Sequence, residues 1–371
     1  MPPTKRIKNN WSENIPTCNL NRTYNLRASS AKALEAKTPL EFFYLFWGKD
    51  IIKTIATESD KYAQQKNSAL NVKKEEIYVV LGAMLLSGYS KCPKKHMYWN
   101  NSDDVPKILY NSICLNRFEF ILPHLHFNDN FLIDKTDKLY KLRPLIEHLN
   151  KSFKEHGGLE EHISIDEDMI SYYGKHYAKQ FIKGKPTRFG YKNWALCTNT
   201  EYCVTFEIYT DKSGTEHVKR FGLGGDVVMN LLKNAMIGHN LDYKIYFDNY
   251  FTTLVLLRHL AKMKICVLGT VHENKMVRCP FPDKKKWSTK PRGSYKFLAS
   301  ESVLIVKWKD NKVVSVASNF SDNTIVKTSR WCRETKLKKQ IDQPLMVAIY
   351  NAGMGGVDKM DNLVAVYRTR I

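Results

Sequence analysis

The stretch from Tyr243 to Thr270, YKIYFDNYFTTLVLLRHLAKMKICVLGT, constrains the fold more than any other part of the chain. Its first residues alternate polar and apolar side chains, and from Leu254 apolar residues recur at helical spacing. The apolar run Ile265 to Leu268 then closes at a glycine and fits a buried strand. The stretch therefore predicts a βαβ unit, in which a helix connects two parallel strands of one sheet.

Asp248 follows the first strand of this unit, where open α/β sheets gather their ligands. The position also suits a cap for the helix that follows, because a carboxylate there accepts hydrogen bonds from the first helical turn. Taken by itself, Asp248 favours the cap. A functional role for Asp248, such as binding a ligand, would be supported only by further acidic residues near it in the fold.

The charge balance limits the classes of molecule that the chain is expected to bind. The 371 residues include 58 Lys and Arg against 37 Asp and Glu, a formal net charge of +21, and 43% of the residues are apolar. A globular chain this basic favours nucleic acid, since no basic amphipathic helix of the membrane-binding kind is evident; the alternative is a soluble basic protein without such a partner. No run reaches the roughly 18 apolar residues of a membrane helix, and no signal peptide or CxxC spacing occurs. These features predict a soluble intracellular protein with reduced cysteines.

The first 157 residues predict a flexible basic arm, residues 1–38, and an all-helical domain, residues 39–157. The arm is polar and aperiodic, and its KRIK is either a weak nuclear address or part of a solvated tail. A capping box at Thr38 begins the first helix. Further helices are expected over Lys73–Ser87, Val105–His124 and Leu142–His156. The expected core residues are Ile77, Val80, Leu81, Met84, Leu85, Ile108, Leu109, Ile113, Phe118, Phe120, Ile121 and Leu122.

Near residue 158 the apolar period changes from 3.6 to 2. His162–Ile170 is typical of a strand, yet it carries Asp166, Glu167 and Asp168 in a row. Neighbouring carboxylates repel, so function explains this run better than structure does; the alternative is a strand end and a solvated turn. Strands at Tyr191–Thr198 and Tyr202–Tyr209 should then form an antiparallel hairpin, and a helix over residues 226–236 leads to the βαβ unit.

Two basic stretches predict contacts with DNA. Residues 171–200 hold six Lys or Arg and no acid, interleaved with aromatic residues, as expected of a surface that neutralises phosphates and stacks on bases; core packing of the aromatic residues is the alternative. Residues 275–296 hold eight basic residues to one acid and open a small β-containing insertion, with strands expected over 303–308 and 313–318 and a second basic cluster over 327–339. The predicted DNA-binding residues are Lys175, Lys179, Lys183, Lys185, Arg188, Lys192, Lys284, Lys285, Lys286 and Arg292.

A third acidic motif follows, where a glycine-rich loop leads into a helix that carries Asp358 and Asp361 on one face; simple amino-terminal helix acids are the alternative. Together with Asp166 and Asp248 this gives three acidic motifs in the order of a ribonuclease H-like fold. Hard divalent cations such as Mg²⁺ bind oxygen ligands. Two such ions about 3.5–4 Å apart can activate water or a 3′-hydroxyl for attack on a phosphodiester.

From about Leu40 onwards the sequence resembles the piggyBac transposases and the proteins derived from them. The resemblance is most specific at SIDEDM (Ser164–Met169), YFDNYFTT (Tyr246–Thr253) and GGVDKMD (Gly355–Asp361), and the order and spacing of these motifs are harder to match by chance than any one motif. The catalytic aspartates of the family fall on Asp166, Asp248, Asp358 and Asp361.

The resemblance implies an α+β fold of the DDE/D transposase type, with a ribonuclease H-like core at residues 158–272 and 346–371. A helical dimerisation and DNA-binding domain precedes this core, and an insertion at residues 273–345 interrupts it. The four aspartates would hold two Mg²⁺ ions, or Mn²⁺ in their place. The protein would be a nuclear homodimer that nicks double-stranded DNA at transposon ends, forms hairpins and joins 3′-hydroxyls to TTAA targets, without a small-molecule substrate.

Members of the family usually continue past the position of Ile371 into further helices and a cysteine-rich zinc-binding module, and they usually begin with an acidic region that is short or absent here. This difference favours DNA and metal binding over completed transposition. Three functions stay open: an active piggyBac-like transposase, a domesticated or truncated non-catalytic DNA-binding protein with the same fold, and a basic scaffold that binds other proteins.

Overall fold

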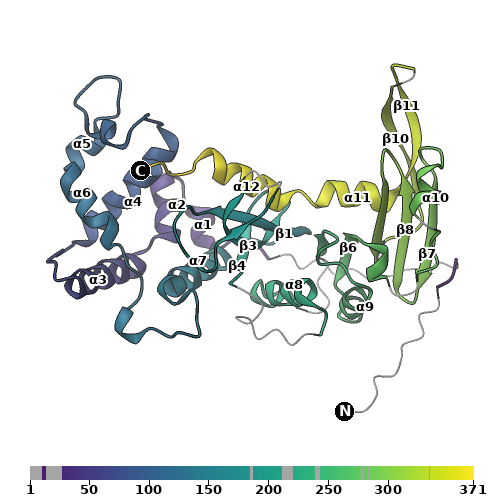
Figure 1. Ribbon diagram of the computed structural model, residues 1–371, viewed down its shortest axis with the longest axis horizontal. Helices are drawn as coiled ribbons and strands as arrows, with labels where there is room; N and C mark the ends of the chain where they lie inside the picture. Colours follow the sequence, from purple (N-terminus) through teal and green to yellow (C-terminus); the bar gives the residue numbers. More distant parts are fainter. Residues whose placement is uncertain are drawn as a thin grey trace, which may run out of the picture.

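A helical region and a nine-stranded sheet follow one another along the long axis of the molecule (Figure 1). The computed structural model describes residues 11–13, 27–183, 187–210, 220–238, 243–276, 279–282, 284–333 and 335–371. Within these ranges every cysteine is a free thiol, and no helix has the length and apolar character needed to cross a membrane.

The helical region is built from six α-helices: α2 (Pro39–Phe46), α3 (Lys49–Gln65), α4 (Lys74–Tyr89), α5 (Ile108–Ser112), α6 (Leu115–Ile121) and α7 (Arg143–His156). Short 3-10 turns lie between them at η1 (Lys95–Trp99), η2 (Leu122–His124), η3 (Asn130–Leu132) and η4 (Tyr140–Leu142). The capping box is confirmed, because Thr38 Oγ1 accepts a hydrogen bond from the Glu41 amide at 3.2 Å and the Glu41 carboxylate accepts one from the Thr38 amide at 2.8 Å.

The prediction of a single helix over Val105–His124 is wrong. The chain is extended at Ile113, whose carbonyl accepts a hydrogen bond from the indole of Trp99 at 2.7 Å, and this contact separates α5 from α6. Leu85, Ile108 and Phe120, which we expected in the core, are exposed, because each lies on the outer face of a helix that buries its other face. Other expected core residues, among them Ile77, Val80, Leu109, Ile113, Phe118 and Ile121, are buried.

The described parts of the amino-terminal segment contact the rest of the chain. The Arg27 amide donates to the hydroxyl of Tyr243, and its guanidinium donates to the Ala235 carbonyl, both at 3.0 Å. Ser12 forms a β-bridge with Ala299, and α1 (Ala31–Glu35) follows Arg27. The described residues of the predicted arm therefore contact the folded chain, whereas KRIK lies outside the described ranges.

The sheet begins with the predicted acidic strand and hairpin. Its first six strands are β1 (His162–Ser171), β2 (Gln180–Phe181), β3 (Phe189–Thr198), β4 (Cys203–Ile208), β5 (Lys244–Phe247) and β6 (Cys266–Thr270). The strand order is β2-β3-β1-β5-β6-β9-β8-β7, and β4 pairs with β3. The βαβ unit is confirmed, because β5 and β6 are parallel and α9 (Leu254–Lys262) connects them. The hairpin of β3 and β4 is confirmed as well, and α8 (Leu223–Asn234) lies between β4 and β5 in the chain.

The first three strands of the insertion continue this sheet, and its last two strands form a separate one. After η5 (Glu273–Lys275) and α10 (Lys284–Ser288), strands β7 (Tyr295–Ser300), β8 (Val303–Lys309) and β9 (Val313–Ser318) follow, and β9 pairs antiparallel with β6. The second basic cluster folds as a two-stranded ribbon, β10 (Ile325–Cys332) and β11 (Leu337–Pro344).

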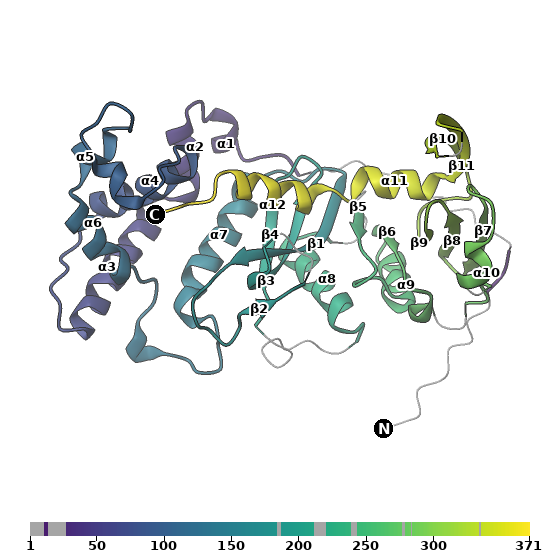
Figure 2. The same cartoon turned by 45° about the horizontal axis from the view of Figure 1, so that its top comes forward.

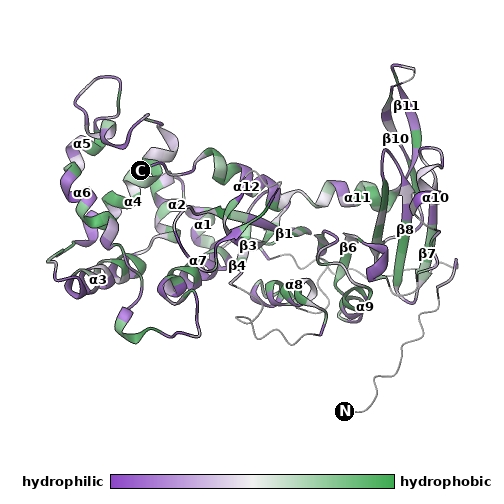
Figure 3. Cartoon of the chain, in the orientation of Figure 1, coloured by the Kyte–Doolittle hydropathy of each residue, from purple (hydrophilic) through white to green (hydrophobic). Residues whose placement is uncertain are grey.

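Helices cover both faces of the sheet (Figure 2). Helices α8 and α9 pack with Ile163, Ile245 and Val267 in one core, whereas Tyr246 and Leu268 pack on the opposite face with α11 (Leu345–Gly353). Helix α12 (Gly356–Val366) continues from α11 along β1 and β3. The expected glycine-rich loop is shorter than predicted, since Tyr350–Gly353 belong to α11. Figure 3 shows hydrophobic residues along β8, one of the strands that these cores bury.

Candidate active site and basic surfaces

Asp166 and Asp248 are brought together by the register of two parallel strands. Ser164 of β1 pairs with Tyr246 of β5, and Ile165 pairs with Phe247. Asp166 is the next residue of β1, and Asp248 directly follows the last residue of β5. Neighbouring strands lie about 4.8 Å apart. Because side chains alternate along a strand, this register assigns both aspartates to the face that carries Ser164 and Tyr246, which is the face that α11 and α12 cover.

Asp248 shapes the turn that leaves β5. Its Oδ1 accepts a hydrogen bond from the Tyr250 amide at 2.8 Å, and its carbonyl accepts one from Thr252 Oγ1 at 2.8 Å. The helix cap is a different residue, since Thr253 Oγ1 accepts from the Leu256 amide at the start of α9. The prediction that Asp248, considered alone, caps the helix is therefore wrong. Burial raises the pKa of Asp248, and the carboxylate of Glu167 raises it further, against lowering contributions from the Tyr250 and Phe251 amides and from Lys275.

Glycines bring the start of α12 against β1. A Cβ on Gly356 would lie 2.4 Å from the Thr198 carbonyl oxygen and 2.6 Å from Ser164 Oγ. The Val357 amide donates to the same Ser164 Oγ at 3.3 Å. This close approach, which needs a residue without a side chain, places Asp358 in the first turn of α12 beside the acidic strand. Asp358 is exposed and Asp361 is half-buried.

Tyr350 of α11 lies within electrostatic range of three of the four aspartates. Burial raises the pKa of its hydroxyl to about 12, a hydrogen bond with Thr270 lowers it, and the carboxylates of Asp248, Asp166 and Asp358 each raise it. The phenol is therefore protonated at neutral pH. The sequence did not single out Tyr350, because a tyrosine in an apolar helix is more often a core residue; its place just before the glycines of the third motif was the available signal.

The four aspartates do not form a closed metal-binding cluster. Within the part of the chain that the structure describes, no group of three or more His, Cys, Asp or Glu side chains is close enough to hold a metal ion. The chemistry of the donors nevertheless fits Mg²⁺, which is usually held by one or two carboxylates and keeps several waters. Asp166 on β1 and Asp248 directly after the adjacent β5 suit such a pair.

The two acids that follow Asp166 have partners on β3. Glu167 forms an ion pair with Lys192 at 2.7 Å, and Asp168 accepts a hydrogen bond from Asn193 at 2.8 Å. The acidic run therefore continues through the strand, contrary to the solvated-turn alternative, and cross-strand neighbours offset part of its repulsion. Lys192, which we predicted to bind DNA, faces Glu167 and the ring of Tyr250, so its charge belongs to the acidic site.

The other predicted DNA-binding residues fall into two groups at opposite ends of the sheet. Lys175, Lys183 and Arg188 are exposed around β2, at one end of the strand order. Lys179, in the same group, donates to the Gly174 carbonyl at 2.9 Å. Several aromatic residues of this stretch are exposed beside them: Tyr173, Tyr177, Phe181 and Phe189. Lys185 lies outside the described residues.

The second group lies near β7, at the other end. Lys285 and Lys286 are exposed on α10, and for Lys284 only the backbone is described. Arg292 differs from the prediction, because its guanidinium binds the Asp310 carboxylate and donates to the Trp331 carbonyl at 3.0 Å. It is committed to internal contacts. The described residues among the ten predicted ones therefore do not form one continuous surface.

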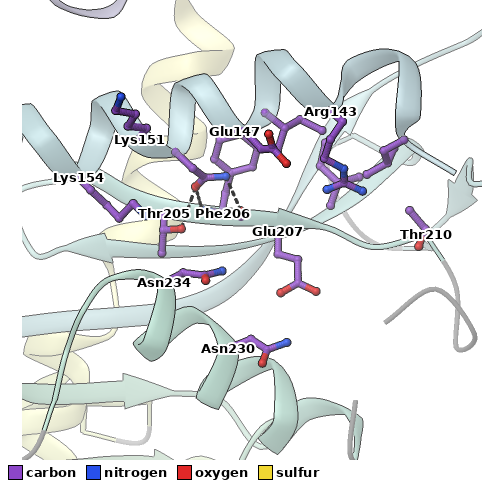
Figure 4. Close-up of a pocket in the computed structure, with 14 residues that line it drawn as sticks. Arg143, Glu147, Lys151, Lys154, Thr205, Phe206, Glu207, Thr210, Asn230 and Asn234 are labelled. Carbon is purple, nitrogen blue, oxygen red and sulfur yellow. Dashed lines mark hydrogen bonds between the residues drawn. The ribbon is translucent and has the colours of Figure 1, made fainter. Parts of the chain in front are cut away.

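A separate polar cleft lies between α7, β4 and α8 (Figure 4). Its walls carry Arg143, Glu147, Glu207 and Asn230, and burial raises the pKa of Glu207. Arg143 is already held by the Asp137 carboxylate, at 2.6 and 2.7 Å. None of the four aspartates of the acidic motifs lines this cleft, so it is distinct from the carboxylate site.

Comparisons with known proteins agree with this arrangement. A family model described as "Transposase IS4" matches residues 38–371. The chain is 37% identical over 338 residues to human PiggyBac transposable element-derived protein 2 and 35% identical over 338 residues to human PiggyBac transposable element-derived protein 3. Each alignment covers 90% of this chain, which spans 57% of the length of either relative.

The fold is similar to that of the piggyBac transposase in a cryo-EM structure of its synaptic complex with hairpin DNA. The TM-score is 0.73 at 23% identity, and the match covers 92% of this chain and 71% of that one. This likeness confirms the predicted fold class, a mixed α+β chain with a ribonuclease H-like transposase core.

Proposed function

Because the chain belongs to the transposase family that includes piggyBac, we propose that it binds double-stranded DNA and breaks phosphodiester bonds at the carboxylates of β1 and β5. The observation that carries the proposal is the adjacency of Asp166 and Asp248 in the strand register. Tyr350, within electrostatic range of these two and of Asp358, supports it.

In this proposal Asp166 and Asp248 hold a divalent cation, Mg²⁺ or Mn²⁺, and Asp358 and Asp361 serve a second ion. Such ions supply an activated water or 3′-hydroxyl and stabilise the leaving oxygen of a phosphodiester. The like charges of the carboxylates favour a cation between them, which would also lower the pKa that burial raises at Asp248.

Other side chains position the reacting groups. Lys275 Nζ donates to the carbonyls of Asn249 and Tyr250 at 2.6 and 2.7 Å, which fixes the turn that carries Asp248. The Tyr350 hydroxyl, protonated at neutral pH, can donate to a phosphate oxygen. Lys192 offsets the charge of Glu167 behind the strand.

The exposed cations and aromatic rings around β2 supply the phosphate and base contacts of the proposal. The structural relative was solved as a synaptic complex with hairpin DNA, which supports DNA as the partner here. Transposon ends and TTAA sites as targets, a homodimer and action in the nucleus belong to the same proposal.

A non-catalytic DNA-binding protein is the second candidate. It is favoured by the spacing of the acidic side chains, because the described residues do not bring three of them into a shared metal cluster. In this case the fold and the basic surfaces would serve binding, and the aspartates would have no catalytic role.

A cleavage assay separates the two candidates. A duplex containing TTAA is incubated with Mg²⁺ and the chain, its Asp248→Asn variant, or an Asp103→Asn control, which changes an exposed carboxylate of the helical region. We expect Asp248→Asn to lose at least about 100-fold in cleavage rate, the scale for a residue that belongs to a catalytic unit, and the control to cleave normally. Equal cleavage by both variants would exclude the carboxylate site. DNA binding by the chain without any cleavage would favour the second candidate.

A further inference from the structure

The ribbon of β10 and β11 projects from the insertion end of the sheet (Figure 1). Its two strands of eight residues pair from Ile325 with Pro344 to Cys332 with Leu337. At about 3.3 Å per residue, the ribbon is roughly 26 Å long. It carries six Lys or Arg and two acids between residues 325 and 344.

The ribbon is braced against the sheet. Asp310, in the turn between β8 and β9, accepts from Arg292 of the segment before β7 and, at 3.1 Å, from Arg330 of β10. Arg292 also donates to the Trp331 carbonyl, and the indole of Trp308 donates to the Asp342 carbonyl at 2.8 Å. These contacts join both strands of the ribbon to the sheet, so its direction is fixed.

The cations toward the tip of the ribbon remain outside this network. Arg333, Lys336, Lys338 and Lys339 are exposed, and among the described residues none forms a hydrogen bond or ion pair with the charged ends of their side chains. Lys327, nearer the base, is instead paired with Asp342. Large side chains are exposed beside the tip, with Trp331 57% and Leu337 66% accessible. Four exposed cations and two exposed apolar groups on a braced ribbon form a surface suited to a partner.

We propose that this ribbon inserts into a groove of the duplex DNA that the carboxylate site acts on. The major groove is about 12 Å wide and admits a two-stranded β-ribbon. The phosphates on either side of the groove are negatively charged and can contact the four exposed cations. The inference rests on the proposed function, since it takes DNA as the partner, and it adds a contact separate from the exposed residues around β2.

The sheet topology places the ribbon on the same edge as the carboxylates. Strand β9 is antiparallel to β6, with Thr270 paired to Val316, so the turn at Asp310 lies at the edge where β5 and β6 end. A pocket lined by Asn249, Thr270 and Val313 marks that shared edge. From β1 to β8 there are four strand spacings, roughly 19 Å. About six base pairs, at 3.4 Å each, span this distance, so one duplex can contact both regions.

The test compares two variants that lose the same charge. Lys338→Ala/Lys339→Ala removes two ribbon cations, and Lys233→Ala/Lys262→Ala removes two exposed lysines from α8 and α9. Binding of the full chain to a random-sequence duplex is measured over a range of salt concentrations. Each lost phosphate contact reduces the slope of log K against log salt by about 0.9. We expect a reduction of about 2 for the ribbon variant and no change for the control, with both variants melting at the temperature of the unmodified chain.

Each outcome bears on a different claim. An unchanged slope in the ribbon variant, while the unmodified chain binds the duplex, overturns the ribbon contact and leaves the proposed function intact. No binding by the unmodified chain overturns both. Equal ribbon-dependent binding to poly-glutamate would assign the ribbon to acidic proteins, and ribbon-dependent binding to single strands without duplex binding would exclude groove insertion. A fluorescence change on duplex binding that Trp331→Phe removes is the positive signature of the tip entering the DNA.

Discussion

The carboxylate site and the β10–β11 ribbon both lie near the edge of the nine-stranded sheet where β5 and β6 end, yet their charged side chains are arranged in opposite ways. The site packs like charges together: Gly356 lets α12 approach β1, and the partly buried Asp248 has a raised pKa. In the ribbon, Arg330 binds Asp310 of the sheet, which also binds Arg292, and the cations toward the tip are exposed. If the site binds a cation as proposed, that cation relieves the repulsion between its carboxylates, whereas the ribbon is held in place by contacts within the chain.

The largest effect is expected at the glycine that makes the site compact. Gly356→Ala places a methyl group 2.4 Å from the Thr198 carbonyl oxygen, so α12 must move away from β1. We expect a loss of about 2 kcal/mol in the free energy of unfolding, measured with urea, together with loss of cleavage.

Gly355→Ala is the matched control for this substitution. Its Cβ would meet no atom closer than the Lys359 side chain at 3.5 Å, an ordinary contact. Equal stability of the two variants would show that the close approach of α12 is not what holds the third motif in place.

The brace of the ribbon should give the next largest effect. Asp310→Asn removes the negative charge that binds Arg292 and Arg330, and these partners are only partly exposed. We expect a local loss of about 1 kcal/mol, which corresponds to roughly fivefold faster hydrogen exchange of the β10 and β11 amides, with β1 and β5 unchanged. Uniformly faster exchange over the whole sheet would contradict a local brace.

The site should show a smaller and pH-dependent effect on stability. The pKa of Asp248 is higher in the folded chain than in the unfolded one, so its stabilising contribution is complete below the unfolded value near pH 4 and is lost as pH rises through the folded value. Without divalent ions, Asp248→Asn should therefore melt a few degrees higher than the unmodified chain at pH 7. Thermal melts from pH 7 to pH 3.5 should show this difference shrinking. A variant that is less stable at pH 7 would contradict the account.

The smallest effect is expected at Lys192. Its amine is held by Glu167 on the strand that carries the acidic run, whereas Lys183 is exposed near β2. Lys192→Gln should leave the salt dependence of duplex binding unchanged, and Lys183→Gln should reduce the slope by about 1. A reduced slope for Lys192→Gln would place that lysine on the DNA surface after all.

Local periodicity predicted the elements that position the site. The alternation around Asp166 and the strand, turn and helix around Asp248 are local signals, and both elements formed as expected. The sequence did not reveal which residue caps α9, because Thr253 and Asp248 are both acceptable caps and the turn geometry decides between them.

Contacts between distant segments were not predictable in the same way. The break at Ile113 depends on an indole from Trp99, and the internal roles of Lys192 and Arg292 depend on acids from other strands. A count of basic residues cannot tell a phosphate contact from an ion pair, which is why the predicted DNA surface divided into separate groups. The extension of the sheet by β9, β8 and β7 likewise needed a pairing between segments far apart in the chain.

We propose that the carboxylates of Asp166 and Asp248 hold a divalent cation. Calorimetric titration of Mn²⁺ into the full chain tests it directly, with Asp166→Asn/Asp248→Asn as the comparison and Asp103→Asn as the control. We expect saturable Mn²⁺ binding by the unmodified chain and the control, and loss of that binding in the double variant. Equal binding by all three, or none by the unmodified chain, would contradict it.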